Sequence, residues 1–193
     1  MSGHDFALPA DLPRPTDDGA CAHLPGMPVP PLTFSSTSGE PASIVAVPDR
    51  LVLYVYPMTG RPGVSLPDGW DLIPGARGCT PEACAFRDHQ AELTAAGATV
   101  MGLSSQSTEY QREVVSRLHL PFPLLSDPDM VLAQEFGLPT FSVDDRLLYS
   151  RLTLVIRNSV VEHVFYPVFP PDAHAAEVLA WLNTRSRGGE FGG

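Results

Sequence analysis

A continuous apolar run, LVLYVY, constrains the fold of this chain more than any other segment. It spans Leu51 to Tyr56 and is closed by Pro57. A run of this kind suits a central strand that is buried on both faces. We therefore expect a central sheet with helices packed against it, which is an α/β architecture.

Helical and strand-like segments alternate after this run. Residues 80–96 and 107–119 have amphipathic helix patterns, with Thr80 as the cap of the first helix and Pro81 in its first turn. The other predicted elements are a hairpin over 31–47, strands over 98–105 and 121–127, a short helix over 127–138, a hairpin over 151–168 and a closing helix over 172–186. Residues 140–150 are ambiguous. Crossovers through the two amphipathic helices imply parallel neighbours and the last hairpin implies antiparallel ones, so the sheet is mixed.

Composition narrows the class of protein. The formal net charge is -10, with 12 basic residues against 22 acidic ones. No basic stripe is visible, so nucleic acid and anionic membranes are poor partners. No apolar run approaches the roughly 20 residues of a membrane helix, and the N-terminus lacks the pattern of a secretory signal. We therefore expect a cytoplasmic protein, in which three cysteines persist for chemistry or as small core residues.

One domain is expected in a chain of 193 residues. Residues 1–27, rich in Pro, Gly and Asp, predict a flexible lead-in, and residues 186–193 a disordered tail. The domain is assigned to 28–185. Within it, residues 58–78 form a loop dense in Gly and Pro, and loops of this length are usually functional or mobile. Cys21 lies in the lead-in and is interpreted as an incidental thiol, with a resolving or metal role as the alternative.

Two cysteines flank the start of the first predicted helix, Cys79 just ahead of it and Cys84 inside it. A helix N-terminus and nearby cations make a thiol nucleophilic by stabilising its thiolate. Arg77 and Arg87 can supply positive charge, and Glu82 adds a carboxylate near the positive helix end. On one helix, residues five apart are separated by about 7.5 Å along the axis and rotated by roughly 140°. A disulfide needs converging Cβ atoms, so the first turns must unwind if the pair bonds. A buried small-residue role is the alternative.

The sequence does not favour a metal site or a phosphate-binding site. Cys-x4-Cys without a second Cys or His pair at suitable spacing is a poor zinc half-site, and the six His are scattered. Residues 60–63, GRPG, do not lead directly into a helix and so do not form a phosphate loop. There is no Gly-x-Ser-x-Gly elbow. No metal or organic cofactor is expected.

Five segments together resemble the peroxiredoxin family of redoxins. They are LVLYVYP, GCTPEACAFRDHQAEL, GLSSQS, LPFPLLSD and RLTLVI, and GCTPEACAFRD is the most specific. The similarity covers Pro28 to Leu182 in order. It is strongest to the peroxiredoxin Q or bacterioferritin-comigratory type, whose two cysteines lie five apart at the start of one helix. The resemblance implies a thioredoxin-like fold and the reduction of hydrogen peroxide or organic hydroperoxides.

The resemblance also implies roles for individual residues. Cys79 would be the peroxidatic nucleophile, which becomes sulfenic acid, and Cys84 the resolving cysteine, which forms an intramolecular disulfide with it. Arg151 matches the family's active-site arginine, where it should lower the pKa of Cys79 and stabilise the departing oxygen. A thioredoxin-like dithiol reductant would then restore both thiols.

The chain departs from the family pattern ahead of the peroxidatic cysteine. The family has a Pro shortly before a Thr that stands three residues ahead of that cysteine. Here Ala76 occupies the Thr position, and Pro57 lies on the far side of the 58–78 insertion. Thr59 and Thr80 are the candidates for the missing hydroxyl. The insertion could cover the site, bind a partner or form a homodimer contact, with a surface excursion as the alternative.

Two other functions stay open at this point. One is a thioredoxin-fold disulfide oxidoreductase without peroxide chemistry. The other is a redox-responsive binding module, whose cysteine pair opens a helix for a partner. Peroxide-dependent oxidation of a thioredoxin system separates a peroxidase from both.

Overall fold

The computed structural model describes residues 7–187, so the first six residues of the predicted lead-in and the last six of the predicted tail lie outside it. The strands are β1 (Thr33–Ser36), β2 (Ala42–Ser43), β3 (Arg50–Val55), β4 (Ala98–Ser104), β5 (Leu124–Ser126), β6 (Thr140–Val143), β7 (Arg146–Tyr149), β8 (Leu152–Arg157) and β9 (Val160–Phe165). The α-helices are α1 (Cys79–Asp88), α2 (Gln90–Ala95), α3 (Thr108–Leu118), α4 (Val131–Phe136) and α5 (His174–Arg187), and the short 3-10 helices are η1 (Trp70–Leu72) and η2 (Pro171–Ala173). No helix in the described part of the chain is long and apolar enough to cross a membrane.

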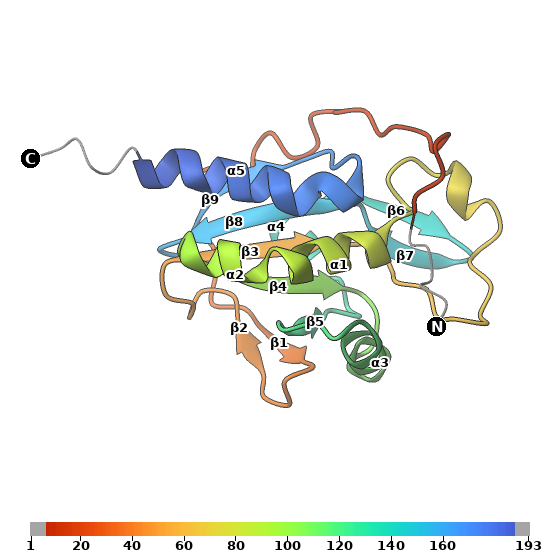
Figure 1. Ribbon diagram of the computed structural model, residues 1–193, viewed down its shortest axis with the longest axis horizontal. Coiled ribbons are helices and arrows are strands. Elements are labelled where there is room, and N and C mark those ends of the chain that lie inside the picture. The colour runs from red at the N-terminus through yellow and green to blue at the C-terminus, as the bar shows by residue number, and fades with distance from the viewer. Residues whose placement is uncertain (1–6, 188–193) are drawn as a thin grey trace, which may run out of the picture.

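Seven strands form one sheet in the order β2-β1-β5-β4-β3-β8-β9 (Figure 1). β3 is parallel to β4 and β4 to β5, whereas β3 pairs antiparallel with β8 and β8 with β9. The predicted mixed sheet, with its parallel crossovers and its antiparallel last hairpin, is therefore confirmed. β3 is the strand expected from the apolar run, and every residue from Leu51 to Val55 is buried.

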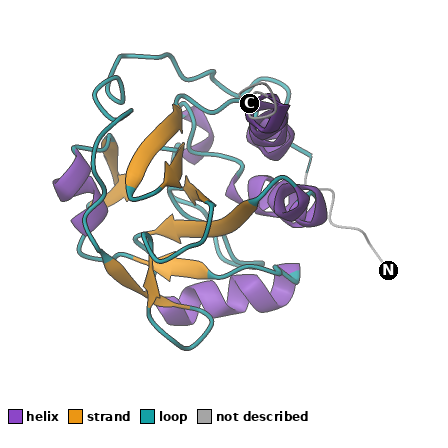
Figure 2. Cartoon of the chain, turned by 90° about the vertical axis from the view of Figure 1, so that its left-hand side faces the viewer, coloured by secondary structure: helices purple, strands orange, loops and turns teal. Residues whose placement is uncertain are grey.

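Two hydrophobic layers cover the two faces of the sheet. On one face, α1, α2, α3 and α5 contribute side chains such as Phe86, Leu93 and Leu182. On the other face, α4 packs Leu132 and Phe136 against the strands. Figure 2 shows helices on both sides of the strands. Each fully buried Leu or Phe contributes about 1.5–3 kcal/mol through removal of apolar surface from water. These layers hold the strand ends in fixed positions.

One local prediction needs correction, and the structure resolves one segment that the sequence left ambiguous. The helix predicted over 80–96 is two helices, because the chain leaves helical geometry at His89, where φ is -97° and ψ is 7°. The ambiguous segment 140–150 is an antiparallel hairpin, β6–β7, that forms a separate small sheet. Its turn residues Asp144 and Asp145 have φ values of 46° and 58°, which suit the two-residue loop of a hairpin.

The described part of the N-terminal lead-in runs along the surface of the domain. Residues 7–27 contain no helix or strand. Cys21 and Leu24 are nevertheless buried in the same hydrophobic layer as α4. The guanidinium of Arg14 lies 4.7 Å from the centre of the Phe169 ring. These contacts tie the segment to the domain, and the domain boundary itself stays a prediction.

The 58–78 insertion folds back beside the β6–β7 hairpin. Its 3-10 helix η1 carries Trp70, which is 3% exposed. Trp70 packs with Ala76 from the end of the insertion and with Leu148 from β7. Figure 1 shows η1 next to β6 and β7. This apolar cluster holds the insertion in one position near the start of α1.

Candidate active site

The first turn of α1 determines where Cys79 lies. Gly78 is the N-cap, with φ 110° and ψ 16°, a backbone conformation that favours glycine. Cys79 is therefore the first residue of the helix rather than the residue before it. Thr80 is not the cap, so that prediction was wrong: Gly78 turns the chain into the helix earlier than the Thr-Pro pattern suggests. The unpaired amides of the first turn give the helix a positive end close to the Cys79 sulfur.

Arg151 is the cation next to Cys79. It directly precedes β8 and is 3% exposed. Its Nη2 donates to the sulfur of Cys79 at 3.1 Å and to the carbonyl of Ala76 at 3.1 Å, while its Nε donates to the carbonyl of Gly75 at 3.2 Å. The end of the insertion therefore holds the guanidinium against the thiol. The expected proximity of Arg151 and Cys79 is present.

Glu82 is the buried counter-ion of Arg151. Its side chain is fully buried, and its Oε2 accepts a hydrogen bond from Nη1 of Arg151. Its Oε1 has no hydrogen-bond partner among residues 7–187. Burial raises the pKa of Glu82, whereas the charges of Arg151 and His174 lower it. The position of Glu82 near the helix end was expected from the sequence, but this ion pair was not. The available signal was its position three residues after Cys79, on the same helix face.

Burial raises the pKa of the Cys79 thiol above that of an ordinary cysteine, because the residue is only 4% exposed. The charge of Arg151 and its hydrogen bond to the sulfur lower this pKa, and a backbone hydrogen bond from Met58 also lowers it. The charge of Glu82 raises it. The expected effect of Arg151 is thus present, but burial outweighs it.

Cys84 lies inside α1 and is 8% exposed. Burial raises the pKa of Cys84, and the charge of Arg87 opposes the rise. Arg87 was expected to act on Cys79, but its position on the helix directs its charge to Cys84 instead. All three cysteines, including Cys21, are free. The two cysteines of α1 are thus unbonded while the helix is intact, as their five-residue spacing predicts.

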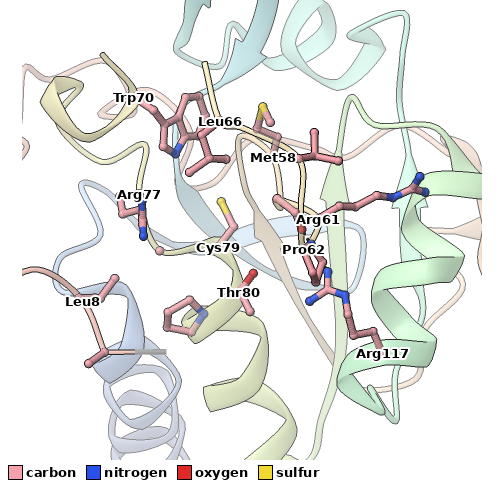
Figure 3. A pocket seen from close by; sticks show the side chains of 15 residues that line it. Leu8, Met58, Arg61, Pro62, Leu66, Trp70, Arg77, Cys79, Thr80 and Arg117 are labelled. Carbon is pink, nitrogen blue, oxygen red and sulfur yellow. Dashed lines mark hydrogen bonds between the residues drawn. The ribbon is translucent and has the colours of Figure 1, made fainter. Parts of the chain in front are cut away.

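The structure separates the two candidates for the missing hydroxyl. Thr59 is buried, and its hydroxyl donates to Oε1 of Gln106 at 3.1 Å. Gln106 Nε2 donates back to the carbonyl of Thr59 at 3.1 Å. Thr59 is therefore hydrogen-bonded to Gln106, and its hydroxyl is not directed at the Cys79 thiol. Thr80 lines the cavity beside Cys79, and Figure 3 shows its hydroxyl inside it. Ala76 contributes its carbonyl group, which accepts from Arg151.

A cavity of about 270 Å³ opens in front of Cys79 (Figure 3). Its lining comes mostly from the 58–78 insertion and otherwise from the lead-in, the start of α1 and the end of α3. Arg77 lines it, and its Nη1 donates to Asp71 at 2.8 Å. Pro57 is buried, lies two residues after the end of β3 and immediately precedes the insertion, but it is not part of the lining. Of the roles considered for the insertion, covering the site is the one that this lining supports.

Two arginines of the cavity wall, Arg61 and Arg117, were not predicted from the sequence. Arg117 comes from the last turn of α3, where its Nε donates to Glu113 at 2.7 Å. Its Nη2 donates to the carbonyl of Gly60 at 3.1 Å, which ties α3 to the insertion. The helical pattern predicts that Arg117 lies on the polar face of α3. It does not predict which loop packs against that face.

The described residues contain no group of three or more His, Cys, Asp or Glu side chains that could hold a metal ion. The site in residues 7–187 therefore consists of a buried thiol, a guanidinium in contact with it, a buried carboxylate and a hydroxyl. This set of groups can hold a thiolate and stabilise negative charge on a nearby oxygen.

The redoxin family model, described as "Redoxin", matches residues 24–179. The chloroplastic peroxiredoxin Q of Sedum lineare is 33% identical over 157 residues, which cover 80% of this chain and 75% of that protein. The putative peroxiredoxin bcp of Coxiella burnetii is 30% identical over 161 residues, which cover 81% of this chain and 97% of that protein.

Solved structures agree with these relatives. The peroxidoxin BcpB of Mycobacterium tuberculosis superposes with a TM-score of 0.67 at 28% identity, covering 84% of this chain and 98% of that one. The peroxiredoxin Q of Xanthomonas campestris gives a TM-score of 0.64 at 25% identity, covering 80% and 91%. The predicted thioredoxin-like fold is therefore confirmed. The chain belongs to the redoxin family and is, within it, a peroxiredoxin of the peroxiredoxin Q/bcp type, an oxidoreductase that acts on peroxides.

Proposed function

We propose that Cys79 is the peroxidatic cysteine of this peroxiredoxin and that Cys84 is its resolving cysteine. The proposed substrates are hydrogen peroxide and organic hydroperoxides, and the proposed reductant is a thioredoxin-like dithiol in the cytoplasm. The observation that carries the assignment is the 3.1 Å hydrogen bond from Arg151 to the Cys79 sulfur, at the base of the cavity. Cys79 is the only cysteine in residues 7–187 that accepts such a bond from a guanidinium.

In the first step, the Cys79 thiolate attacks the terminal oxygen of the hydroperoxide. An S–O bond forms, the O–O bond breaks, and the electron pair leaves with the second oxygen. That oxygen takes up one proton, which balances the proton that the Cys79 thiol lost. It leaves in a water molecule when the substrate is hydrogen peroxide, or in an alcohol when the substrate is an organic hydroperoxide. Cys79 is left as sulfenic acid. Arg151 stabilises the charge that develops on the departing oxygen, and Thr80 offers a hydroxyl to the bound hydroperoxide.

In the second step, the Cys84 thiol attacks the sulfenic sulfur. An S–S bond forms and one water leaves, made from the sulfenic hydroxyl and the proton of the Cys84 thiol. The first turns of α1 must unwind for this step, since the intact helix keeps the two side chains apart. The dithiol reductant then exchanges with the disulfide and is itself oxidised. Both electrons come from thiols, so the cycle consumes no other cofactor.

The test is rapid-mixing kinetics on the reduced protein with one equivalent of hydrogen peroxide, followed by peptide mapping of the product. The wild-type protein is expected to give a Cys79–Cys84 disulfide. Cys84→Ser is expected to stop at Cys79 sulfenic acid, which a sulfenic-acid reagent traps, and to lose turnover with thioredoxin. Cys79→Ser is expected to lose the reaction with peroxide.

Cys21→Ser is the matched control, because Cys21 lies in the opposite hydrophobic layer. It is expected to react and turn over like the wild type. Peroxide consumption that survives Cys79→Ser rejects the peroxidatic assignment. Full turnover of Cys84→Ser rejects the resolving assignment and redirects it to Cys21.

A further inference from the structure

The cavity in front of Cys79 is larger than hydrogen peroxide needs. Its volume is about 270 Å³, whereas a water molecule takes up about 30 Å³ in the liquid and hydrogen peroxide has only one more oxygen. The insertion supplies most of the lining, and Leu8 of the lead-in closes one side. The insertion and the lead-in thus border a space that extends well beyond the O–O bond of the substrate.

One wall of the cavity is apolar. Met58, Leu66 and Trp70 of the insertion line it, and Figure 3 shows them grouped on one side of Cys79. Trp70 is held there by its cluster with Leu148. Burial of an apolar substrate body on this wall contributes about 25 cal/mol for each Å² removed from water. The wall therefore favours an organic hydroperoxide over hydrogen peroxide.

Three arginines give the lining positive charge. Arg61, Arg77 and Arg117 all line the cavity, and no acidic residue in the described range 7–187 does. They are three of the 12 basic residues in a chain of net charge -10, so positive charge is concentrated here against the overall sign. A concentration of this kind attracts anionic substrates to the cavity.

Carboxylates outside the lining balance this charge only in part. Asp71 pairs with Arg77, while Glu113 is shared between Arg61 at 3.6 Å and Arg117 at 2.7 Å. Within residues 7–187, two carboxylates thus pair with three guanidinium groups. Nη1 of Arg117 has no hydrogen-bond acceptor among residues 7–187. Figure 3 shows Arg117 reaching toward the cavity from α3, on the side opposite to Arg77.

We infer that this peroxiredoxin selects organic hydroperoxides that carry a carboxylate group away from the O–O bond. The apolar body of the substrate contacts Met58, Leu66 and Trp70, and Arg117 binds the carboxylate. Arg117 is then a specificity-determining residue that touches substrate and takes no part in breaking the O–O bond. The inference rests on the proposed reaction of Cys79 with hydroperoxides.

The test compares para-carboxycumene hydroperoxide with its methyl ester, which differs in charge and keeps the aryl body. The rate constant for Cys79 oxidation is measured for both and for hydrogen peroxide. The wild type is expected to prefer the acid over the ester. Arg117→Gln is expected to reduce the acid-to-ester ratio by about 5- to 10-fold, because one charge-assisted hydrogen bond is lost at a partly exposed position. Added salt is expected to reduce the wild-type ratio in the same direction.

Three further variants separate substrate binding from loop support. Arg117→Lys keeps the charge and is expected to retain most of the ratio. Trp70→Ala is expected to slow acid and ester alike relative to hydrogen peroxide. Arg112→Gln is the matched control, since Arg112 is an exposed residue of the same helix, and it is expected to change neither rate nor ratio.

The outcomes distinguish this inference from the proposed function. Equal rates for acid and ester in the wild type, or an unchanged ratio in Arg117→Gln, overturn the anionic preference while Cys79 still reacts with hydrogen peroxide. If no hydroperoxide oxidises Cys79, the proposed function itself fails.

Discussion

The Nη2 nitrogen of Arg151 lies 3.1 Å from the sulfur of Cys79, although 72 residues separate the two in the chain. The contact exists because β8 pairs with β3, and β3 leads into the insertion that ends at α1. The carbonyl of Ala76 accepts from the same nitrogen. Sheet pairing and loop backbone together set the distance between cation and thiol.

Replacement of Arg151 is expected to raise the pKa of Cys79 further. Arg151 lowers this pKa by its charge and hydrogen bond, while burial raises it. In Arg151→Met the thiolate fraction at pH 7 therefore falls, and the peroxide rate is expected to drop by roughly 10²- to 10³-fold. The pH dependence of Cys79 alkylation measures the pKa. Arg146→Met, at an exposed position, is the control. An unchanged or lower pKa in Arg151→Met contradicts the prediction.

Replacement of Glu82 is expected to shift the pKa of Cys79 in the opposite direction. Its charge raises the pKa of Cys79, so Glu82→Gln is expected to lower that pKa and increase the thiolate fraction at neutral pH. Glu82→Ala also leaves the buried guanidinium of Arg151 without its partner. That loss is expected to reduce the free energy of unfolding by about 3–5 kcal/mol, measured in urea. A pKa that rises in Glu82→Gln shows that Glu82 acts mainly by positioning Arg151.

Gly78 is expected to be intolerant of a side chain. A Cβ at this position would lie 2.4 Å from Cγ of Pro171, and φ is 110°. Gly78→Ala is therefore expected to lower the free energy of unfolding by roughly 2–4 kcal/mol through backbone strain and steric overlap. Gly97→Ala is the matched control, because φ there is 78° and an added Cβ would have no heavy atom of the described residues within 4 Å other than those of its chain neighbours. It is expected to cost about 1 kcal/mol. Equal losses of unfolding free energy in the two variants would show that Pro171 moves away from the added methyl group at little energetic cost.

Oxidation is expected to open the first turns of α1. In the described structure the amide of Glu82 donates to the carbonyl of Gly78 at 3.0 Å, as in an intact helix. After reaction with peroxide, hydrogen exchange at the amides of α1 is expected to accelerate by at least about tenfold, because a Cys79–Cys84 disulfide requires unwinding. The amides of α3 provide the internal reference. Cys84→Ser, treated in the same way, is expected to keep its protection in α1. Unchanged exchange in the disulfide form would rule out unwinding.

The pair Arg50–Glu162 is expected to make stability depend on pH. Nε and Nη2 of Arg50 donate to the two carboxylate oxygens of Glu162 at 2.6 and 2.9 Å, which joins β3 to β9. This hydrogen bonding lowers the pKa of Glu162. The contribution, about 1–2 kcal/mol, is fully present above the ordinary Glu pKa of about 4.3 and is lost as pH falls through the lowered value.

Urea denaturation of Glu162→Gln at several pH values measures this contribution. The variant is expected to be less stable than the wild type at pH 7, with the difference disappearing toward pH 3. Glu135→Gln, at an exposed position of α4, is the control and is expected to show no such difference. If the difference in unfolding free energy between Glu162→Gln and the wild type stays constant down to pH 3, the effect comes from packing and not from the charge of Glu162.

Much of the framework was predictable because it depends on local patterns. The apolar run at 51–56 specified the central strand, and the helical periodicity after it required crossovers and hence parallel neighbours. The five-residue spacing of Cys79 and Cys84 likewise specified an unbonded pair, because helix geometry alone decides that distance. The acidic turn of β6–β7 concealed its strand pattern, since Asp is uncommon in strands.

The surroundings of the thiol depended on contacts between distant segments. The family resemblance, and no local pattern, placed Arg151 near Cys79, and no local pattern shows that Arg117 lines the cavity. The helix position of Glu82 indicates the face that it shares with Cys79 and not its burial. Sequence spacing describes neighbours along one helix or strand, whereas these contacts arise from sheet pairing and loop packing. The pKa of Cys79 also depends on the tertiary structure. Burial results from tertiary packing, and here its effect on the pKa outweighs that of the neighbouring Arg151 charge.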